Sequence, residues 1–154
     1  MNKQMAEGMF GYFRMVLGVT RKIVDQFPAD KMNFKPTDAQ RTVAETVVHM
    51  YYFLLIAMES IRDGKVPENM AEPKISGKAE LLAYMDKNVE AANKIFAGLT
   101  DDQLAQMIEA WGMTFPAWQM LTFTNDEHWH HRGALTVYLR LCGIEPIMIY
   151  SYEQ

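Results

Sequence analysis

The chain has 154 residues, of which 49% are hydrophobic and 22% are charged, as expected for one globular domain spanning residues 1–154. Its formal net charge of −4 and its scattered lysines and arginines argue against nucleic-acid binding, since phosphate recognition requires a basic surface. No apolar run reaches the roughly 18 residues of a membrane-spanning helix, the first residues do not resemble a signal peptide, and Cys142 is the only cysteine, so we expect a cytoplasmic protein without a membrane partner.

The first predicted helix starts near the N-terminus and ends before Pro28. Its apolar side chains recur at steps of three and four residues, which is the period of one buried helical face. They are Met5, Met9, Tyr12, Phe13, Val16, Leu17, Ile23, Val24 and Phe27. Between Phe27 and Arg41, two prolines and several turn-forming residues oppose a helix and predict an irregular connection.

A second helix is predicted after Thr42, because Thr42 and Glu45 have the spacing of a capping box. In a capping box, the hydroxyl and the carboxylate each accept a hydrogen bond from a free backbone amide at the helix start. This helix carries His49 and ends at Asp63-Gly64, and a second irregular connection with two prolines follows. Its apolar ridge comprises Val43, Val47, Met50, Leu54, Met58 and Ile61.

Ser76 is the expected N-cap of a third helix, which stops at Gly98. Residues 100–103, Thr-Asp-Asp-Gln, are predicted to start a short extra turn. Residues 109–116 are poor helix formers, and we expect them to form an extended strap across the bundle.

The last long helix is predicted to begin near Pro116, a residue favoured in the first turn of a helix, and to end at Cys142, before Gly143. Residues 144–154 keep several apolar side chains and are expected to dock on the rest of the protein. Four long amphipathic helices without a convincing strand pair predict an all-α four-helix bundle, with a short extra segment before the last helix. The long connections favour crossover loops, because simple up-and-down bundles need shorter ones.

Residues 126–133 contain three of the four histidines of the chain, inside the last predicted helix. Positions three or four residues apart share one face of a helix, so Glu127 and His131 form one convergent pair of metal ligands, and His128 and His131 form another. Both pairs are stereochemically reasonable. His49 on the second helix can supply a third ligand, and three protein ligands leave one coordination position open for chemistry.

A core histidine held by a hydrogen bond is the alternative to a metal ligand. A buried imidazole without a partner costs about 1–3 kcal/mol, and metal coordination avoids that cost, so we favour a metal site. His130 points about 100° away from His131 on an ideal helix and is expected outside this site. The inward seam that carries His131 comprises Leu121, Thr124, His128, His131, Leu135, Tyr138 and Cys142.

The segment His130–Gly143, HHRGALTVYLRLCG, resembles the closing helix of the DinB/YfiT-like metalloenzymes, a family unrelated to the DNA polymerase that shares the DinB name. The resemblance extends over the whole chain, in its length, in the four-helix bundle and in a second-helix histidine that is matched by His49. Members of the family carry a histidine four residues before the second histidine of this motif, where the chain has Glu127. The glutamine that follows the glycine in the family is Ala134 here.

This resemblance implies a divalent metal ion, zinc or nickel above others, held by His49, Glu127 and His131, with His128 as the alternative to Glu127. It also implies a homodimer and a small-molecule substrate. Characterised relatives of the family suggest a transferase that uses a low-molecular-weight thiol such as bacillithiol or mycothiol. The thiolate, which a metal ion stabilises, is the reactive nucleophile.

Two other functions are left open by the sequence. If His128 is the ligand, Glu127 can act as the general base of a metal-dependent hydrolase. Alternatively, the metal site is structural or vestigial in a noncatalytic, stress-related metal-binding or dimerisation protein.

The substrate pocket is not apparent from the sequence. Tyr12, Tyr51, Tyr138 and Arg132 are candidates for its lining, although aromatic residues at helical spacing usually belong to the core. Arg132 is equally well explained as a solvated charge or as the partner of Glu127 or of an anionic substrate.

Overall fold

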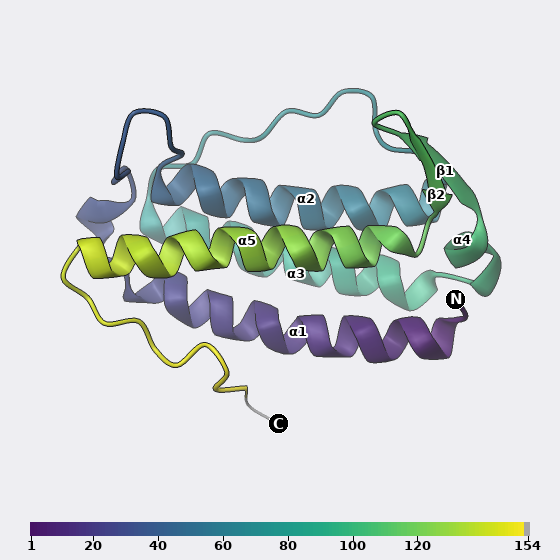
Figure 1. Cartoon of the computed structure of the whole chain (residues 1–154), viewed down its shortest axis with the longest axis horizontal. Helices are drawn as coiled ribbons and strands as arrows, with labels where there is room; N and C mark the ends of the chain where they lie inside the picture. Colours follow the sequence, from purple (N-terminus) through teal and green to yellow (C-terminus); the bar gives the residue numbers. More distant parts are fainter. Residues whose placement is uncertain (153–154) are drawn as a thin grey trace.

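The structure, a computed structural model, describes residues 1–152 and has four long helices arranged as a bundle (Figure 1). These helices are α1 (Lys3–Gln26), α2 (Val43–Asp63), α3 (Lys78–Gly98) and α5 (Gln119–Leu141). The shorter elements are the 3-10 helix η1 (Ala29–Lys31), the helix α4 (Asp101–Ala105) and the strands β1 (Met107–Ala110) and β2 (Met113–Pro116). The predicted all-α four-helix bundle is confirmed, and one small hairpin is added to it.

The order of the helices around the bundle requires a long crossover. Helices α1 and α2 each pack against both α3 and α5, so α1 lies diagonally opposite α2. Figure 1 shows that α1 and α5 run in one direction and that α2 and α3 run in the other. Because α2 and α3 are parallel neighbours, residues 64–77 must return along the whole bundle before α3 begins. The predicted crossover loop is therefore present.

The starts of the helices follow local capping chemistry only in part. The capping box at Thr42 is present as predicted: Glu45 N donates to Thr42 Oγ1 and Thr42 N donates to Glu45 Oε2. A second box at Thr100 starts α4, the predicted extra turn. The prediction of Ser76 as an N-cap is wrong, because Gly77 occupies that position without a side-chain hydrogen bond. Lys78 instead anchors this helix start, since its Nζ donates to the Asp25 carbonyl.

The segment expected to be a strap is an antiparallel hairpin, so the prediction that no strands pair is wrong. Its two-residue turn has positive φ at both positions, 52° at Trp111 and 74° at Gly112, which is the backbone that closes a tight hairpin. The pairing places the buried Ile108 opposite the buried Phe115. It also holds Pro116 in β2, opposite Met107, so Pro116 does not start α5 as predicted.

Two glutamines join α4 and the segment before the hairpin to the end of α2. Gln103 Nε2 donates to the Arg62 carbonyl, and Gln106 Nε2 donates to the Ile61 carbonyl at 2.6 Å. These carbonyls belong to the last turn of α2. The carbonyls of a last turn have no backbone N–H partner within the helix. The two glutamine side chains therefore cap the C-terminal end of α2 from a later segment of the chain.

The C-terminal segment docks on the bundle, as expected for its described part. Ile144, Ile147, Ile149 and Tyr152 pack against the hydrophobic core, and Gln26 accepts a hydrogen bond from the Ile147 amide. The final two residues, which were included in the same expectation, lie outside the described residues. Within residues 1–152, no helix combines the length and the apolar character required to cross a bilayer.

We expect Thr42→Ala to lower the free energy of unfolding by about 1 kcal/mol, because the amide of Glu45 loses its hydrogen-bond acceptor at the start of α2. Thr42→Ser should restore most of this stability. Urea denaturation monitored by circular dichroism measures the change, with the exposed Thr37→Ala as the matched control. Equal losses in the Thr42→Ala and Thr37→Ala proteins would contradict a capping role.

Candidate metal centre

The packing of α2 against α5 brings three of the predicted site residues together. His49 extends from α2, whereas Glu127 and His131 lie one turn apart on α5. His49 Nε2 is 3.1 Å from Glu127 Oε1, and His131 Nε2 is 3.3 Å from the same oxygen. One ligand atom from each residue lies within 4.8 Å of the other two. We refer to these three residues as the triad.

The spacing of the triad suits a small divalent ion. Ligands bound at about 2.1 Å in tetrahedral geometry lie roughly 3.4 Å apart, close to the two nitrogen–oxygen distances measured here. The triad is half-buried, so a fourth position can be reached from outside the protein. Two imidazole nitrogens and one carboxylate oxygen form a donor set that zinc and other first-row divalent ions accept.

Glu72, on the crossover loop, holds the other side of the His49 ring. His49 Nδ1 is 2.6 Å from Glu72 Oε1, and Arg41 Nη1 donates to Glu72 Oε2 at 2.9 Å. A carboxylate that accepts the Nδ1 proton fixes the ring orientation and leaves Nε2 free to bind a metal. Sequence reasoning missed Glu72, because it lies in an irregular loop where no helical spacing relates it to His49.

The protonation states at the triad fit metal binding. Burial opposes ionisation of Glu127, but its hydrogen bond from His49 and the adjacent His131 outweigh that effect and lower the pKa of Glu127 below its ordinary value. Burial also lowers the pKa of His131, although Glu127 acts in the opposite direction. A carboxylate and a neutral imidazole are the forms that bind a cation.

His128 lies outside the triad, although the sequence allowed it as the alternative to Glu127. Its Nε2 is 2.7 Å from Thr20 Oγ1 on α1, and its ring packs edge-on against Phe13 and Tyr51. The side chain is 1% exposed. His128 is thus a core histidine with a hydrogen-bond partner, and Glu127 is the α5 residue that faces His49.

His130 and Arg132 flank the triad in different ways. His130 is exposed, and its ring lies 4.8 Å from the His131 ring. Arg132 is buried, so its interpretation as a solvated charge is wrong. Its guanidinium lies 3.9 Å from the centre of the Trp129 ring, and its two terminal nitrogens make no hydrogen bond within the described part of the chain. It therefore does not pair with Glu127.

One cleft borders the triad, and a second lies beside Glu72 without contacting a triad residue. The polar cleft, of about 730 Å³, lies between the connection that precedes α2 and the crossover loop, and Glu72 is part of its wall. Its charged lining comprises Lys35, Asp38, Arg41, Glu45, Glu72 and Lys74. The hairpin groove, of about 450 Å³, is bordered by Asp126, Glu127 and His130 and has an apolar wall of Phe53, Trp111, Met113 and Phe123.

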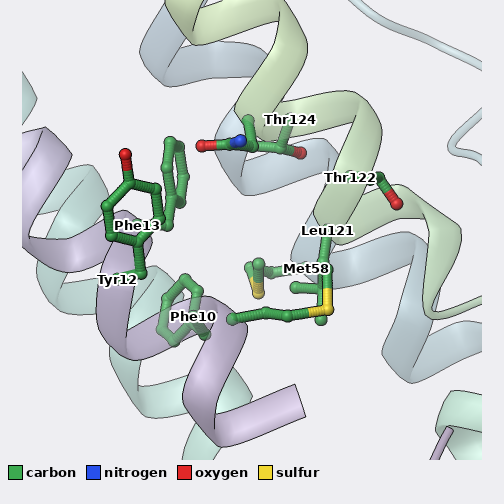
Figure 2. A pocket seen from close by; sticks show the side chains of 9 residues that line it. Phe10, Tyr12, Phe13, Met58, Leu121, Thr122 and Thr124 are labelled. Carbon is green, nitrogen blue, oxygen red and sulfur yellow. The ribbon is translucent and has the colours of Figure 1, made fainter. Parts of the chain in front are cut away.

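The tyrosines considered for a substrate pocket line neither of these clefts. Tyr51 is buried, and Tyr138 donates to the Arg41 carbonyl. Tyr12 borders a smaller cavity of about 160 Å³ between α1, α2 and α5. Figure 2 shows this cavity, in which Phe10 and Phe13 face Leu121 and Met58. No residue of the triad lines it.

The burial of His128 predicts a pH-dependent stability. Burial, together with the charges of Arg132 and His131, lowers the pKa of His128 to about 3, whereas an unfolded chain protonates histidine near about 6.5. The unfolded state therefore binds more protons in this window. The stabilising contribution is complete above about pH 6.5 and is lost, by up to about 1.4 kcal/mol per pH unit, as the pH falls toward 3.

Urea denaturation at about pH 6.5 and about pH 5 tests this expectation. The stability difference between wild type and His128→Leu should change by about 1–2 kcal/mol between these conditions. His130→Gln, which replaces an exposed histidine on the same helix, should keep the pH dependence of the wild type. Parallel pH profiles of wild type and His128→Leu would show that the buried ring does not have the lowered pKa.

Comparisons with known proteins agree with the fold and with the sequence motif. The sequence model of the DinB family matches residues 1–154. The chain is 25% identical over 139 residues to the uncharacterized protein YjoA of Bacillus subtilis (strain 168), which covers 86% of this chain and 88% of that protein.

Solved structures show the same arrangement of helices. The crystal structure of the DinB-like protein YjoA from Bacillus subtilis superimposes with a TM-score of 0.81 at 21% identity, covering 96% of this chain and 99% of the other. For a DinB-like protein from Bacillus cereus ATCC 10987, the TM-score is 0.79 at 18% identity, with 94% and 97% of the two chains covered. The match of the family model over the whole length establishes that this chain belongs to the DinB family.

Proposed function

We propose that this protein is a metal-dependent enzyme, and specifically a transferase that uses a low-molecular-weight thiol. The observation that supports this proposal best is the convergence of His49, Glu127 and His131 beside the hairpin groove, with the polar cleft close by at Glu72, the partner of His49. A site that served stability alone would more typically have four protein ligands and no adjoining cavities.

His49, Glu127 and His131 would hold the ion, with zinc and nickel as the preferred candidates. Glu72 would keep His49 in the tautomer that presents Nε2 to the ion. A divalent ion in this position lowers the pKa of a thiol that occupies its open coordination position, and thereby supplies the nucleophile at neutral pH.

The polar cleft would bind the thiol cosubstrate. Its lining carries both charges, as does a small thiol with amino and carboxylate groups. Lys35 pairs with Asp38, and Arg41 pairs with Glu72, whereas Lys74 makes no ion pair or hydrogen bond with the other described residues. Lys74 is thus available to a carboxylate of the cosubstrate.

In the proposed reaction the thiol sulfur forms a bond to an electrophilic carbon, and the leaving group departs with its bonding electron pair. The proton of the thiol passes to solvent. For the hydrolase, the sequence offered Glu127 as the general base if His128 is the ligand, but His128 is turned toward Thr20 instead. The transferase is therefore the better supported of the two.

We expect protein purified without an affinity tag to contain close to one divalent ion per chain by elemental analysis. His49→Ala, Glu127→Ala and His131→Ala should each lower the metal content at least about tenfold, because two ligands hold an ion much less tightly than three. His130→Ala and His128→Leu are the controls and should retain the ion. Absence of metal from wild type, even after reconstitution, would overturn the proposal.

Turnover and unfolding temperature, measured on the same samples, distinguish a catalytic metal site from a structural or noncatalytic one. Metal-loaded wild type should consume bacillithiol or mycothiol in the presence of an electrophile, and chelation should abolish turnover with little change in unfolding temperature. Bound metal without turnover would support the noncatalytic alternative. A large loss of stability on chelation would identify a structural site. The homodimer implied by the family resemblance stays a prediction, which light scattering can test.

Glu72→Gln should weaken metal binding by roughly 10–100-fold, because the ring of His49 loses its charged acceptor at Nδ1. Competition with a chromophoric chelator measures the affinity. Glu68→Gln removes the same charge from an exposed position on the same loop and should leave the affinity unchanged. Equal affinities in the two variants would show that Glu72 does not support the site.

A further inference from the structure

We propose that the hairpin groove binds the electrophilic substrate and that this substrate is a flat, uncharged aromatic molecule. This inference rests on the proposed function, since it names the second substrate of the same site. Four kinds of observation support it: the composition of the groove, the backbone of the hairpin turn, the charge at the rim, and the position of Glu127.

The apolar wall of the groove is exposed although it is made of large side chains. Trp111 and Met113 are each 52% exposed. The ring of Trp111 lies nearly parallel to that of Phe115, with an interplanar angle of 8°, and it also adjoins the ring of Phe53. The groove volume of about 450 Å³ falls within the range of small-molecule sites. Rings presented in this way favour a planar apolar ligand.

The turn places Trp111 where a bulky residue is unfavourable. Its φ of 52° lies in the left-handed region, which tight hairpin turns usually fill with glycine or asparagine. Neither the core nor the strand pairing needs an indole here, since half of the side chain faces solvent. Backbone strain of this kind concentrates at ligand-binding sites. The strained turn directs a tryptophan toward the groove instead of the core.

The charge at the rim selects against anions. Asp126 and Glu127 border the groove, and its lining contains no lysine or arginine. An anionic ligand would thus approach Asp126, which does not belong to the triad, without a lysine or arginine beside it, whereas an uncharged ring would not. The polar cleft, which Glu72 lines, carries Lys35, Lys74 and Arg41. The two clefts are therefore suited to different reactants.

Glu127 connects the groove to the triad. It lines the groove, while its Oε1 lies within hydrogen-bond distance of both His49 and His131. Glu72 lines the polar cleft and contacts the opposite nitrogen of the His49 ring. The polar cleft and the groove are accordingly joined to opposite nitrogens of the His49 ring, the cleft through Glu72 and the groove through Glu127.

Ligand-observed NMR with 1,3-dinitrobenzene tests the proposal directly, with 3,5-dinitrobenzoate as its anionic counterpart. The wild type freed of metal by chelation should bind the neutral ring at least about tenfold more tightly than the anion, because a bound ion would itself attract the carboxylate. Trp111→Ser and Met113→Ser should each weaken binding of the neutral ring severalfold or more, and Trp111→Phe should retain part of it. Tyr150→Ser, which removes another exposed aromatic side chain away from the groove, is the control and should bind as the wild type does.

Repeating the titration with His131→Ala separates this inference from the proposed function. Retained binding of the neutral ring by a protein that has lost its metal would support the groove independently of the ion. Binding of the neutral ring by a wild type that takes up no metal would leave the groove standing and overturn the proposed function. Equal binding by wild type and by both serine variants, or equal binding of neutral and anionic rings, would overturn the inference while the metal site stands.

Discussion

The candidate site depends on one carboxylate oxygen that is shared by two histidines from different helices. Glu127 Oε1 lies 3.3 Å from Nε2 of His131 on its own helix and 3.1 Å from Nε2 of His49 on α2. The half-buried carboxylate thus fixes the two rings at the separation of metal ligands, in a setting where electrostatic attraction is stronger than in water. A cation bound at these three atoms would compete with protons for the imidazole nitrogens, which would couple metal affinity to pH.

The parallel arrangement of α2 and α3 gives the site a residue that a simpler bundle would lack. In an up-and-down bundle, a short turn would link neighbouring helices and no chain would pass alongside His49. Here residues 64–77 return along the bundle, and Glu72 in that loop contacts the His49 ring. Arg41 in turn donates a hydrogen bond to Glu72. The topology therefore contributes to the chemistry as well as to the packing.

Helical periodicity predicted the ligand spacing on α5 and most of the buried faces of the long helices, because both are local properties. It was wrong for Met5 and Tyr12 on α1, which are exposed. It did not distinguish Glu127 from His128, which are neighbours and both lie within one turn of His131. Their side chains diverge by about 100° around the helix, so that one meets His49 and the other meets Thr20. Only the rotation of α5 within the bundle, which tertiary packing determines, decides between them.

The errors at Ser76, Pro116 and the strap have the same origin. Serine before a helix and proline in a first turn are sound local preferences, but Lys78 and the pairing of β2 with β1 override them. The hairpin itself depends on a Trp-Gly turn with positive φ at both residues. The pattern of apolar and polar side chains does not predict such a turn. Glu72 could not be found because it lies in an irregular loop, 23 residues after His49 in the sequence.

The glutamines that cap α2 mechanically couple the two parts of the proposed active site. Gln106 links the base of the hairpin to the Ile61 carbonyl, and Gln103 links α4 to the Arg62 carbonyl, so the wall that contains Trp111 is fastened to the helix that carries His49. A shift of α2 along its axis would move His49 and the hairpin together. Two amide hydrogen bonds about three and a half turns away from the histidine therefore help to hold the apolar wall at its distance from the metal ligands.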